Sequence, residues 1–541
     1  MPLSRREALA ALAGLSAVAA CRVRTDDLPR IEGAIVGGSH LRGHKVRDGF
    51  RPTARKRQRA GVAILGGGIA GLSAAWALDR AGFHDYLVLE LEGLPGGTAR
   101  SGRNQVSAYP WAAHYVPVPP PANRPLVALL EEIGAVTGRD AAGRPVYAES
   151  MLCRDPQERV FFRGEWYEGL YPRVGVPPAE LRQFHRFEEL ANRWAAWRDA
   201  RGRRAFDLPR VRGSDAEEVR ALDRGSMADW LREQGFDSPR LRWFVEYGCR
   251  DDFGSTLAQT SAWAGLHYFA ARLDESAHDS AEFLTWPEGN GRLVEHLVGR
   301  AGNRARSSAV VTEIEPRPDG VRVAYFDEQL QEPFELLAEH AVCALPRFVV
   351  GHLVRPWLAA RPPFLAETVY SPWVVANLTL HDRPRGRGFP LAWDNVLYAS
   401  PALGYVVATH QSGHDHGPTV LTWYLAVLDD DPKKARERLL KTTWEEWVAL
   451  ILADLAPAHP GLRELVERVD VMVWGHAMVR PRPGFVWGPA LAASAAPLGR
   501  LHFAHTDLSG MALFEEAQYW GVKAAEAVLR DRGQRFASWL E

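Results

Sequence analysis

The chain has 541 residues, of which 46% are hydrophobic and 24% are charged, and its formal net charge is −1. This composition is typical of a folded protein with two or more structural units, and it excludes intrinsic disorder and collagen-like repeats. The balance of 65 Lys and Arg against 66 Asp and Glu argues against a nucleic-acid partner that needs a large basic surface. Four cysteines in so long a chain exclude a disulfide scaffold.

The first 21 residues have the pattern of an export signal. Arg5 and Arg6 precede an uncharged run of small residues over 8–20, and Cys21 follows that run. The pattern is typical of a secretory signal, and the arginine pair indicates the twin-arginine route for proteins exported already folded. The residues before Cys21 fit both a simple cleavage site and a lipobox, so a lipidated Cys21 is one alternative. We therefore expect a periplasmic protein or a membrane-anchored lipoprotein.

Residues 22–59 show no sustained periodicity. Glycines and arginines are scattered through the segment without an apolar face. We expect a solvated linker or an irregular arm here.

A dinucleotide-binding pattern begins at residue 61. The apolar run 62–65 predicts a buried parallel strand, and residues 66–71 read GGGIAG, which matches G-x-G-x-x-G. Residues 72–78 have helix-forming composition, and a second strand over 86–89 ends at Glu90. Glu90 stands where a carboxylate accepts hydrogen bonds from a ribose.

The three glycines have separate roles in such a motif. Gly66 allows the tight turn, Gly68 lets a pyrophosphate approach the backbone, and Gly71 lets the helix pack closely on the strand. The uncharged run 61–78 is long enough to suggest a membrane span, but its five glycines and its division into strand, loop and helix favour the nucleotide fold. The predicted cradle consists of Gly66, Gly68, Ile69, Ala70 and Gly71.

The residues after Glu90 indicate the cofactor. Residues 91–101 read LEGLPGGTARS. Together with the preceding motif, this stretch resembles the flavin-containing amine oxidase family and its relatives, the protoporphyrinogen oxidases and carotenoid desaturases. The resemblance implies that Gly96, Gly97 and Arg100 contact the pyrophosphate of FAD, with Thr98 standing where the family usually has its Arg.

Later segments extend the resemblance over most of the chain. It implies that the backbone at Val311 faces the adenine and that Asp507 binds the ribityl–pyrophosphate region. His505 stands where the family has a Gly. The segments are WPEGNGRL over 286–293, AVVTEI over 309–314, AVCALP over 341–346 and RLHFAHTD over 500–507.

The resemblance implies a two-domain α/β plus α+β flavoprotein. A Rossmann-like FAD-binding domain would be assembled from residues 60–135, 281–350 and 466–541. Residues 136–280 and 351–465 would form a substrate domain with helices and an antiparallel sheet. Its elements are predicted as helices over 179–198 and 216–234 and strands over 374–380 and 419–425.

Two departures from the family concern the chemistry. One lies just before the last helix, where the sequence has Leu513 and Phe514 in place of the family's aromatic-cage Tyr, and the other is a missing Lys. The strand segment 373–377 has no Lys, so the family's flavin-side Lys is absent. No Cys lies in 474–484, so the resemblance implies that FAD is bound without a covalent bond. The catalytic candidates are His114 and Tyr115, which resemble the segment under the flavin ring, and Phe514 and Glu515 at the start of the last helix.

The resemblance implies an enzyme that oxidises a C–H bond next to nitrogen by hydride transfer to flavin N5. The substrate would be a small molecule, and the electron acceptor oxygen or a quinone. Two alternatives stay open. One is a desaturase-like or protoporphyrinogen-oxidase-like enzyme that passes electrons to a quinone or other acceptor, and the other is a non-catalytic flavin-binding protein.

The remaining histidines and cysteines predict no metal site. His410, His414 and His416 lie in a glycine-rich turn, where such residues are more often solvated than metal-bound. The cysteines have no metal-like spacing. Cys153, Cys249 and Cys343 are expected to be buried thiols.

Overall fold

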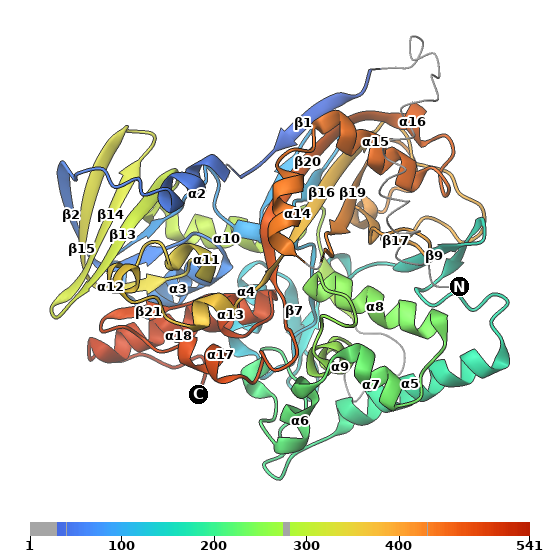
Figure 1. Cartoon of the computed structure of the whole chain (residues 1–541), viewed down its shortest axis with the longest axis horizontal. Helices are drawn as coiled ribbons and strands as arrows, with labels where there is room; N and C mark the ends of the chain where they lie inside the picture. The colour runs from blue at the N-terminus through green and yellow to red at the C-terminus, as the bar shows by residue number, and fades with distance from the viewer. Residues whose placement is uncertain (1–29, 39, 274–281, 430) are drawn as a thin grey trace.

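The computed structural model describes residues 30–38, 40–273, 282–429 and 431–541. The predicted signal segment 1–21, including Cys21, lies outside the described residues. Two large sheets organise the chain, with a group of helices beside the second (Figure 1).

The first sheet has seven strands and carries the predicted dinucleotide motif. Its parallel part joins β12, β3, β2 and β15, and the short strand β21 also pairs with β15 in parallel. Residues 62–65 are fully buried, which explains why this strand reads as an unbroken apolar run. The strands are β2 (Lys56–Leu65), β3 (Tyr86–Leu89), β12 (Ala305–Arg306), β13 (Ala309–Arg317), β14 (Gly320–Asp327), β15 (Glu332–Cys343) and β21 (Leu501–Phe503).

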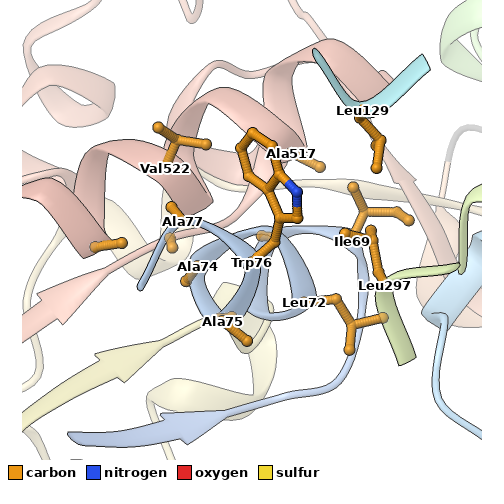
Figure 2. Close-up of a cluster of buried hydrophobic side chains, with 14 of the residues drawn as sticks. Ile69, Leu72, Ala74, Ala75, Trp76, Ala77, Leu129, Leu297, Ala517 and Val522 are labelled. Atoms are coloured by element: carbon orange, nitrogen blue, oxygen red, sulfur yellow. The ribbon is translucent and has the colours of Figure 1, made fainter. Parts of the chain in front are cut away.

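Helices cover this sheet and fix the position of the glycine motif. Figure 2 shows Trp76 of α3 between Leu129 of α4 and the α18 residues Ala517 and Val522. The Trp76 side chain is 1% exposed, and its indole N–H donates to Glu132 at 3.1 Å. The apolar sides of these helices thus meet in one core that holds α3 on the sheet. The helices are α3 (Ile69–Arg80), α4 (Arg124–Glu132), α10 (Gly291–Ala301) and α18 (Phe514–Asp531).

The second sheet has eight strands in the order β1-β20-β16-β19-β18-β17-β9-β10. Its centre is antiparallel, as predicted for the two strand segments. All eleven residues of β16 are buried, and the apolar helix α15 (Trp444–Leu455) belongs to the same core. The strands are β1 (Glu32–Val36), β9 (Glu158–Phe162), β10 (Glu165–Glu168), β16 (Tyr370–Leu380), β17 (Asp394–Leu397), β18 (Gly404–Val407), β19 (Thr419–Ala426) and β20 (Val466–Val479).

A helical group lies beside the second sheet, as predicted for the middle of the chain (Figure 1). The single helix predicted over 216–234 is wrong. The chain forms α6 and α7, and a 3-10 turn over 222–224 followed by Gly225 and Ser226 separates them. Ser226 caps α7 in a capping box with Asp229, and this local hydrogen bonding begins a new helix. The group consists of α5 (Pro178–Ala196), α6 (Glu217–Ala221), α7 (Met227–Glu233), α8 (Pro239–Phe253) and α9 (Ala262–Ala270).

Shorter elements complete the fold. Three two-stranded ribbons pair β4 with β5, β6 with β11 and β7 with β8. Their strands are β4 (Ser101–Arg103), β5 (Ala108–Pro110), β6 (Tyr115–Pro117), β7 (Val136–Arg139), β8 (Pro145–Tyr147) and β11 (Phe283–Thr285). The other helices are α2 (His40–Arg47), α11 (Arg347–Val350), α12 (Arg355–Ala359), α13 (Phe364–Glu367), α14 (Pro432–Leu439), α15 (Trp444–Leu455), α16 (Leu462–Leu465) and α17 (Pro489–Ser494).

The segment expected as a linker over 22–59 is ordered where the structure describes it. β1 pairs in parallel with β20, and α2 follows it (Figure 1). Main-chain pairing along a sheet edge needs no apolar pattern in the added strand, so this strand could not be recognised from the residue pattern. The proposed segment boundary at 466 also differs, because β20 belongs to the second sheet.

The three cysteines outside the predicted signal segment lie as the sequence predicts. Cys153, Cys249 and Cys343 are free and buried, as predicted, and burial raises the pKa of the Cys249 thiol to about 12. Within the described ranges, no helix combines the length and the apolar character that a membrane crossing requires.

Candidate active site

The glycine motif forms an open cradle at the start of α3. A Cβ at Gly71 would lie 1.9 Å from the Gly66 carbonyl oxygen, so only glycine allows the helix to approach the strand there. Gly66 has a φ of 101°, which the tight turn requires. A Cβ at Gly68, in contrast, would meet no atom within 4 Å. The glycine loop is therefore closely packed at Gly71, whereas the space next to Gly68 is free of protein atoms.

Glu90 ties this cradle to the neighbouring strands. Its carboxylate accepts the Gly67 N–H at 2.7 Å and the Glu92 N–H at 2.8 Å. Its carbonyl accepts the Ala309 N–H at 2.8 Å, and Val311 follows two residues later at a bulge in β13. Burial raises the pKa of Glu90, and the two N–H donors oppose that shift. Glu90 thus lies at the predicted position between the cradle and the strand that carries Val311.

The second glycine pair lies against the first. Gly68 forms a bridge with Gly96, and a Cβ at Gly97 would have Gly68 Cα, at 3.5 Å, as its nearest neighbour. Gly68 is the N-cap of α3, and no side chain caps this helix. Backbone N–H groups at such a helix start bind phosphate. The residues present therefore fit a dinucleotide whose pyrophosphate would lie in the open space next to Gly68, at the start of α3.

Arg100 is 8% exposed and lies between the glycine turn and the second sheet. Its Nε–H donates to the Gly97 carbonyl at 3.2 Å, and its guanidinium lies 5.1 Å from the centre of the Trp474 ring. The predicted contact with a pyrophosphate stays a prediction. What the structure shows is that Arg100 holds the second glycine pair against β20.

Asp507 is 2% exposed and already has several partners. It accepts a hydrogen bond from the Tyr370 hydroxyl and the Arg347 N–H at 2.8 Å, and its own N–H donates to His505 Nδ1 at 3.1 Å. Burial acts to raise the pKa of Asp507, but His505, Tyr370 and the Arg347 N–H together hold it below its ordinary value. His505 has an extended backbone with a φ of −164°, so no glycine is required at this position.

An aromatic group surrounds His114. The His114 ring lies 4.9 Å from the Tyr424 ring, 5.3 Å from the Trp393 ring and 5.3 Å from the Tyr115 ring, centre to centre. Phe283 extends the group, at 4.8 Å from Trp393 and 5.4 Å from Tyr115. Rings from the β6–β11 ribbon and from the second sheet thus meet at one place.

His114 is a neutral imidazole with a defined tautomer. Its Nδ1 lies 2.9 Å from the Ala112 carbonyl oxygen, and a carbonyl can only accept, so Nδ1 carries the proton. Burial lowers the pKa of His114 to about 4, although the Ala112 carbonyl opposes this shift. Nε2 therefore keeps a free lone pair at neutral pH, and it can accept a hydrogen bond or a proton.

Carboxylates lie beside the aromatic group. Asp394 follows Trp393 in the chain, pairs across the sheet with Glu158, and accepts the Tyr247 hydroxyl at 3.0 Å. Burial raises the pKa of Glu158 to about 7, and burial with the charge of Glu158 raises that of Asp394. Burial, followed by repulsion from Asp252, raises the pKa of Asp251 to about 7.

Desolvation dominates the electrostatics of these groups, although their side chains are not fully buried. His114, Tyr115, Glu158 and Asp394 keep partly exposed side chains, and yet burial is the largest cause of the pKa shift in each. Partial exposure combined with strong desolvation is typical of the wall of an active site.

The four predicted catalytic candidates do not all meet there. His114 and Tyr115 are in contact, and the charges of Arg272, Asp252 and Glu515 all act on the Tyr115 hydroxyl. Burial raises the pKa of Glu515 to about 7. Phe514 instead belongs to the apolar core around α3 and is 9% exposed.

Several residues that lie around His114 and Asp394 were not predicted from the sequence as site residues. They come from separate strands and helices with no shared motif, so only the fold brings them together. Tyr424 alone lay in a segment predicted as a strand. The missed residues are Glu158, Tyr247, Asp251, Arg272, Trp393, Asp394 and Tyr424.

The histidines of the glycine-rich turn do not converge. His410 is 3% exposed, and its Nε2 lies 2.9 Å from the Arg154 carbonyl oxygen, whereas His414 and His416 are exposed. The Nε2 atom of His410 is therefore engaged by a backbone carbonyl.

The fold has two large sheets, a glycine loop that fits a dinucleotide at the start of α3, and an aromatic group around His114. The sequence profile described as "Flavin containing amine oxidoreductase" matches residues 69–529. The chain belongs to this family, and it is a flavin-dependent oxidoreductase of amine-oxidase type. The resemblance read from the motifs is thereby confirmed.

Individual relatives agree with this assignment. An L-amino acid dehydrogenase from Synechocystis sp. is 23% identical over 490 residues, which cover 86% of this chain and 94% of that protein. Among solved structures, putrescine oxidase bound to putrescine has a TM-score of 0.64 at 17% identity and covers 88% of this chain and 100% of its own. Cyclohexylamine oxidase from Brevibacterium oxydans has a TM-score of 0.61 at 18% identity, over 88% and 99%. At 17% and 18% identity, the similarity to these two solved structures shows that this chain shares their fold.

Proposed function

We propose that this protein binds FAD without a covalent bond and oxidises a C–H bond next to the nitrogen of a cationic amine. The observation that supports this most strongly is the wall in which the His114 aromatic group adjoins the Glu158–Asp394 carboxylate pair. A cationic group placed there would be attracted by the carboxylates and by the faces of the aromatic rings.

The carboxylates favour an amine over an amino acid as the substrate. Burial raises the pKa of Glu158 to about 7, and a cation nearby would bring that pKa down and stabilise the ionised form. A substrate carboxylate would be repelled by the same groups. Arg272, which could attract it, already donates to Asp252 at 2.5 Å.

The chain's own residues would prepare the amine for oxidation. Bound flavin supplies the two-electron acceptor for the hydride. His114 Nε2 can accept a hydrogen bond from the substrate nitrogen and so orient it. Glu158, whose pKa burial raises to about 7, is the stronger proton acceptor, and loss of the ammonium proton frees the nitrogen lone pair that drives hydride loss from the adjacent carbon. Trp393, Tyr424 and Tyr115 exclude water from that position. This arrangement would serve in place of the Lys that the family usually carries and that is absent from β16.

Anaerobic mixing tests the proposal. The flavin-loaded protein is mixed without oxygen with monoamines, diamines, amino acids and polyenes, and the loss of oxidised-flavin absorbance is followed. Amines should reduce the flavin fastest, and Glu158→Gln should raise the amine concentration needed for half-maximal rate. Glu168→Gln, an exposed change on the neighbouring strand β10, is the control. Reduction only by polyenes would favour a desaturase-like enzyme, and no reduction by any compound would favour a non-catalytic flavoprotein.

We also propose that the protein is exported by the twin-arginine route and passes its electrons to oxygen or a quinone. Arg5 and Arg6 support the route, and so does a cofactor site assembled from segments far apart in the chain, which requires folding before export. Replacing both arginines by Lys should leave flavin-loaded precursor in the cytoplasm. If Cys21 is lipidated, Cys21→Ser should move the mature protein from the membrane fraction to the soluble fraction.

A further inference from the structure

A cluster of two histidines and one aspartate lies on the first sheet, away from the active site. His340 of β15 and His502 of β21 stand on one face of two paired parallel strands, because His502 pairs with Val342. Asp531, the last residue of α18, lies over that face. One nitrogen of each ring and one carboxylate oxygen lie within 4.8 Å of one another.

Among the residues that the structure describes, the two ring nitrogens that face Asp531 have no partner with full hydrogen-bond geometry. His340 Nδ1 lies 4.0 Å from Asp531 Oδ2, and His502 Nε2 lies 3.2 Å from the same oxygen. Both contacts are within ion-pair distance, although neither has the full geometry of a hydrogen bond. The residues His340 and His502 are 3% and 7% exposed. A buried polar atom without a partner destabilises a protein, so two that point at one carboxylate require an explanation.

We propose that His340, His502 and Asp531 bind a zinc ion or a similar divalent transition metal. Two ligand atoms about 2.1 Å from a tetrahedral ion lie roughly 3.4 Å apart, so side-chain shifts of under about 1 Å would close this set around an ion. Two imidazoles with one carboxylate suit zinc, whereas calcium and magnesium prefer oxygen ligands alone.

The surroundings leave room for the ion to enter. The Asp531 side chain is 50% exposed, so the fourth position of a tetrahedral ion would face solvent and hold water. Arg500 and Arg532 are the nearby cations, and Arg532 is paired with Glu339. Their positive charge lowers the affinity for the ion without occupying the ligand atoms.

The proposed ion would act as a structural clamp. It would join β15 and β21 to the end of α18, while the start of the same helix borders the active site at Glu515. Eighteen helical residues span about 25 Å, which places the ion far from the flavin. We therefore expect an effect on stability, and no direct part in oxidation.

Zinc titration of the flavin-loaded protein tests the proposal. The protein is stripped with a chelator, dialysed and titrated with Zn²⁺ against a chromophoric competitor, with Mg²⁺ as a second probe. We expect one zinc per chain and no magnesium. His502→Gln and Asp531→Asn should each weaken zinc binding at least ~100-fold, more than is typical for loss of a residue that only supports a ligand. The double variant His414→Gln/His416→Gln removes two exposed imidazoles and should bind zinc as the wild type does.

Thermal unfolding gives a second readout. Saturating zinc should raise the Tm of the wild type and leave that of Asp531→Asn unchanged, because an ion that binds only the folded state stabilises it. Asp531 is half exposed, so its variant should fold even if a histidine variant does not. A wild type that binds no zinc at 10-fold molar excess would overturn the proposal. Equal zinc binding by Asp531→Asn would do so as well.

Discussion

The carboxylate of Glu90 accepts the N–H of Gly67 at 2.7 Å, which fixes the middle of the glycine loop to the end of β3. The same carboxylate holds the Glu92 N–H at 2.8 Å. One acidic side chain thus orders both loops that border the open space at Gly68. A ribose hydroxyl donating to this carboxylate would bind in a site that is already formed.

Replacing Glu90 should weaken cofactor binding. Glu90→Ala removes one or two hydrogen bonds to a charged group, each worth about 1.5–3 kcal/mol. Loss of one such bond raises Kd roughly 10- to 150-fold. Titration of the apoprotein with FAD measures the change. Asp85→Asn is a matched control, because Asp85 accepts the Gly61 N–H at 2.9 Å at the other end of the β2–β3 pair. Equal FAD affinity in Glu90→Ala and the wild type would show that the ribose is held elsewhere.

Two glycines of the motif should respond in opposite ways to a methyl group. Gly68→Ala should fold, since its Cβ meets no atom within 4 Å, but the methyl group would occupy the space of a pyrophosphate and reduce FAD binding. Gly71→Ala should fail to fold stably, because its Cβ would lie 1.9 Å from the Gly66 carbonyl oxygen. Circular dichroism and flavin content separate the two results. A Gly68→Ala protein with full flavin content would place the pyrophosphate outside the cradle.

The fold of the dinucleotide region could be predicted closely from the sequence. The strand at 86–89 and the helix from Phe514 follow the apolar pattern, because both are buried elements with clear ends. The β1 edge strand could not be predicted, since its pairing uses main-chain groups that carry no sequence signal. The break at Ser226 depends on a capping box inside an otherwise helical pattern.

The active site was less predictable than the cradle. Glu90 and the glycines stand in one local motif, whereas Glu158 and Asp394 lie in strands that the chain brings together from 236 residues apart. No spacing rule connects such residues. Phe514 was chosen for its position at the start of α18, but its ring faces the core because the first turn of that helix packs on α3.

The stability of the apoprotein should depend on pH through Glu158. The folded state raises the pKa of this group from its ordinary value of 4.5 to about 7, so between these values the folded state binds a proton that the unfolded state has lost. Its contribution to stability is therefore complete below pH 4.5 and falls as pH rises to about 7. Glu158→Gln should match the wild type at pH 4 and be more stable at pH 8, by at most about 3 kcal/mol, and less where solvent reaches the group.

Thermal unfolding at the two pH values measures this difference. Glu168→Gln, an exposed change on β10, should show no pH-dependent gain. A Glu158→Gln variant that is less stable than the wild type at pH 8 would mean that Glu158 is ionised and well paired in the folded apoprotein.

The N-terminal strand should detach when Gly33 gains a side chain. A Cβ at Gly33 would lie 1.8 Å from the Val469 carbonyl oxygen, and the residue has a φ of +138°. Gly33→Ala should lower stability by about 1–3 kcal/mol and expose the segment before α2 to proteases. Gly43→Ala in α2 meets no atom within 4 Å and should be neutral or stabilising. Identical proteolysis of the two variants would show that β1 is not held by β20.

Identification of the bound flavin tests the central claim most directly. The protein is purified, its absorbance spectrum is recorded, and it is then denatured and filtered so that any released cofactor passes into the filtrate. We predict a yellow protein that releases about one FAD per chain and a filtered chain without colour. A colourless protein that gains no flavin from added FAD, or a flavin that stays attached to the denatured chain, would contradict the account.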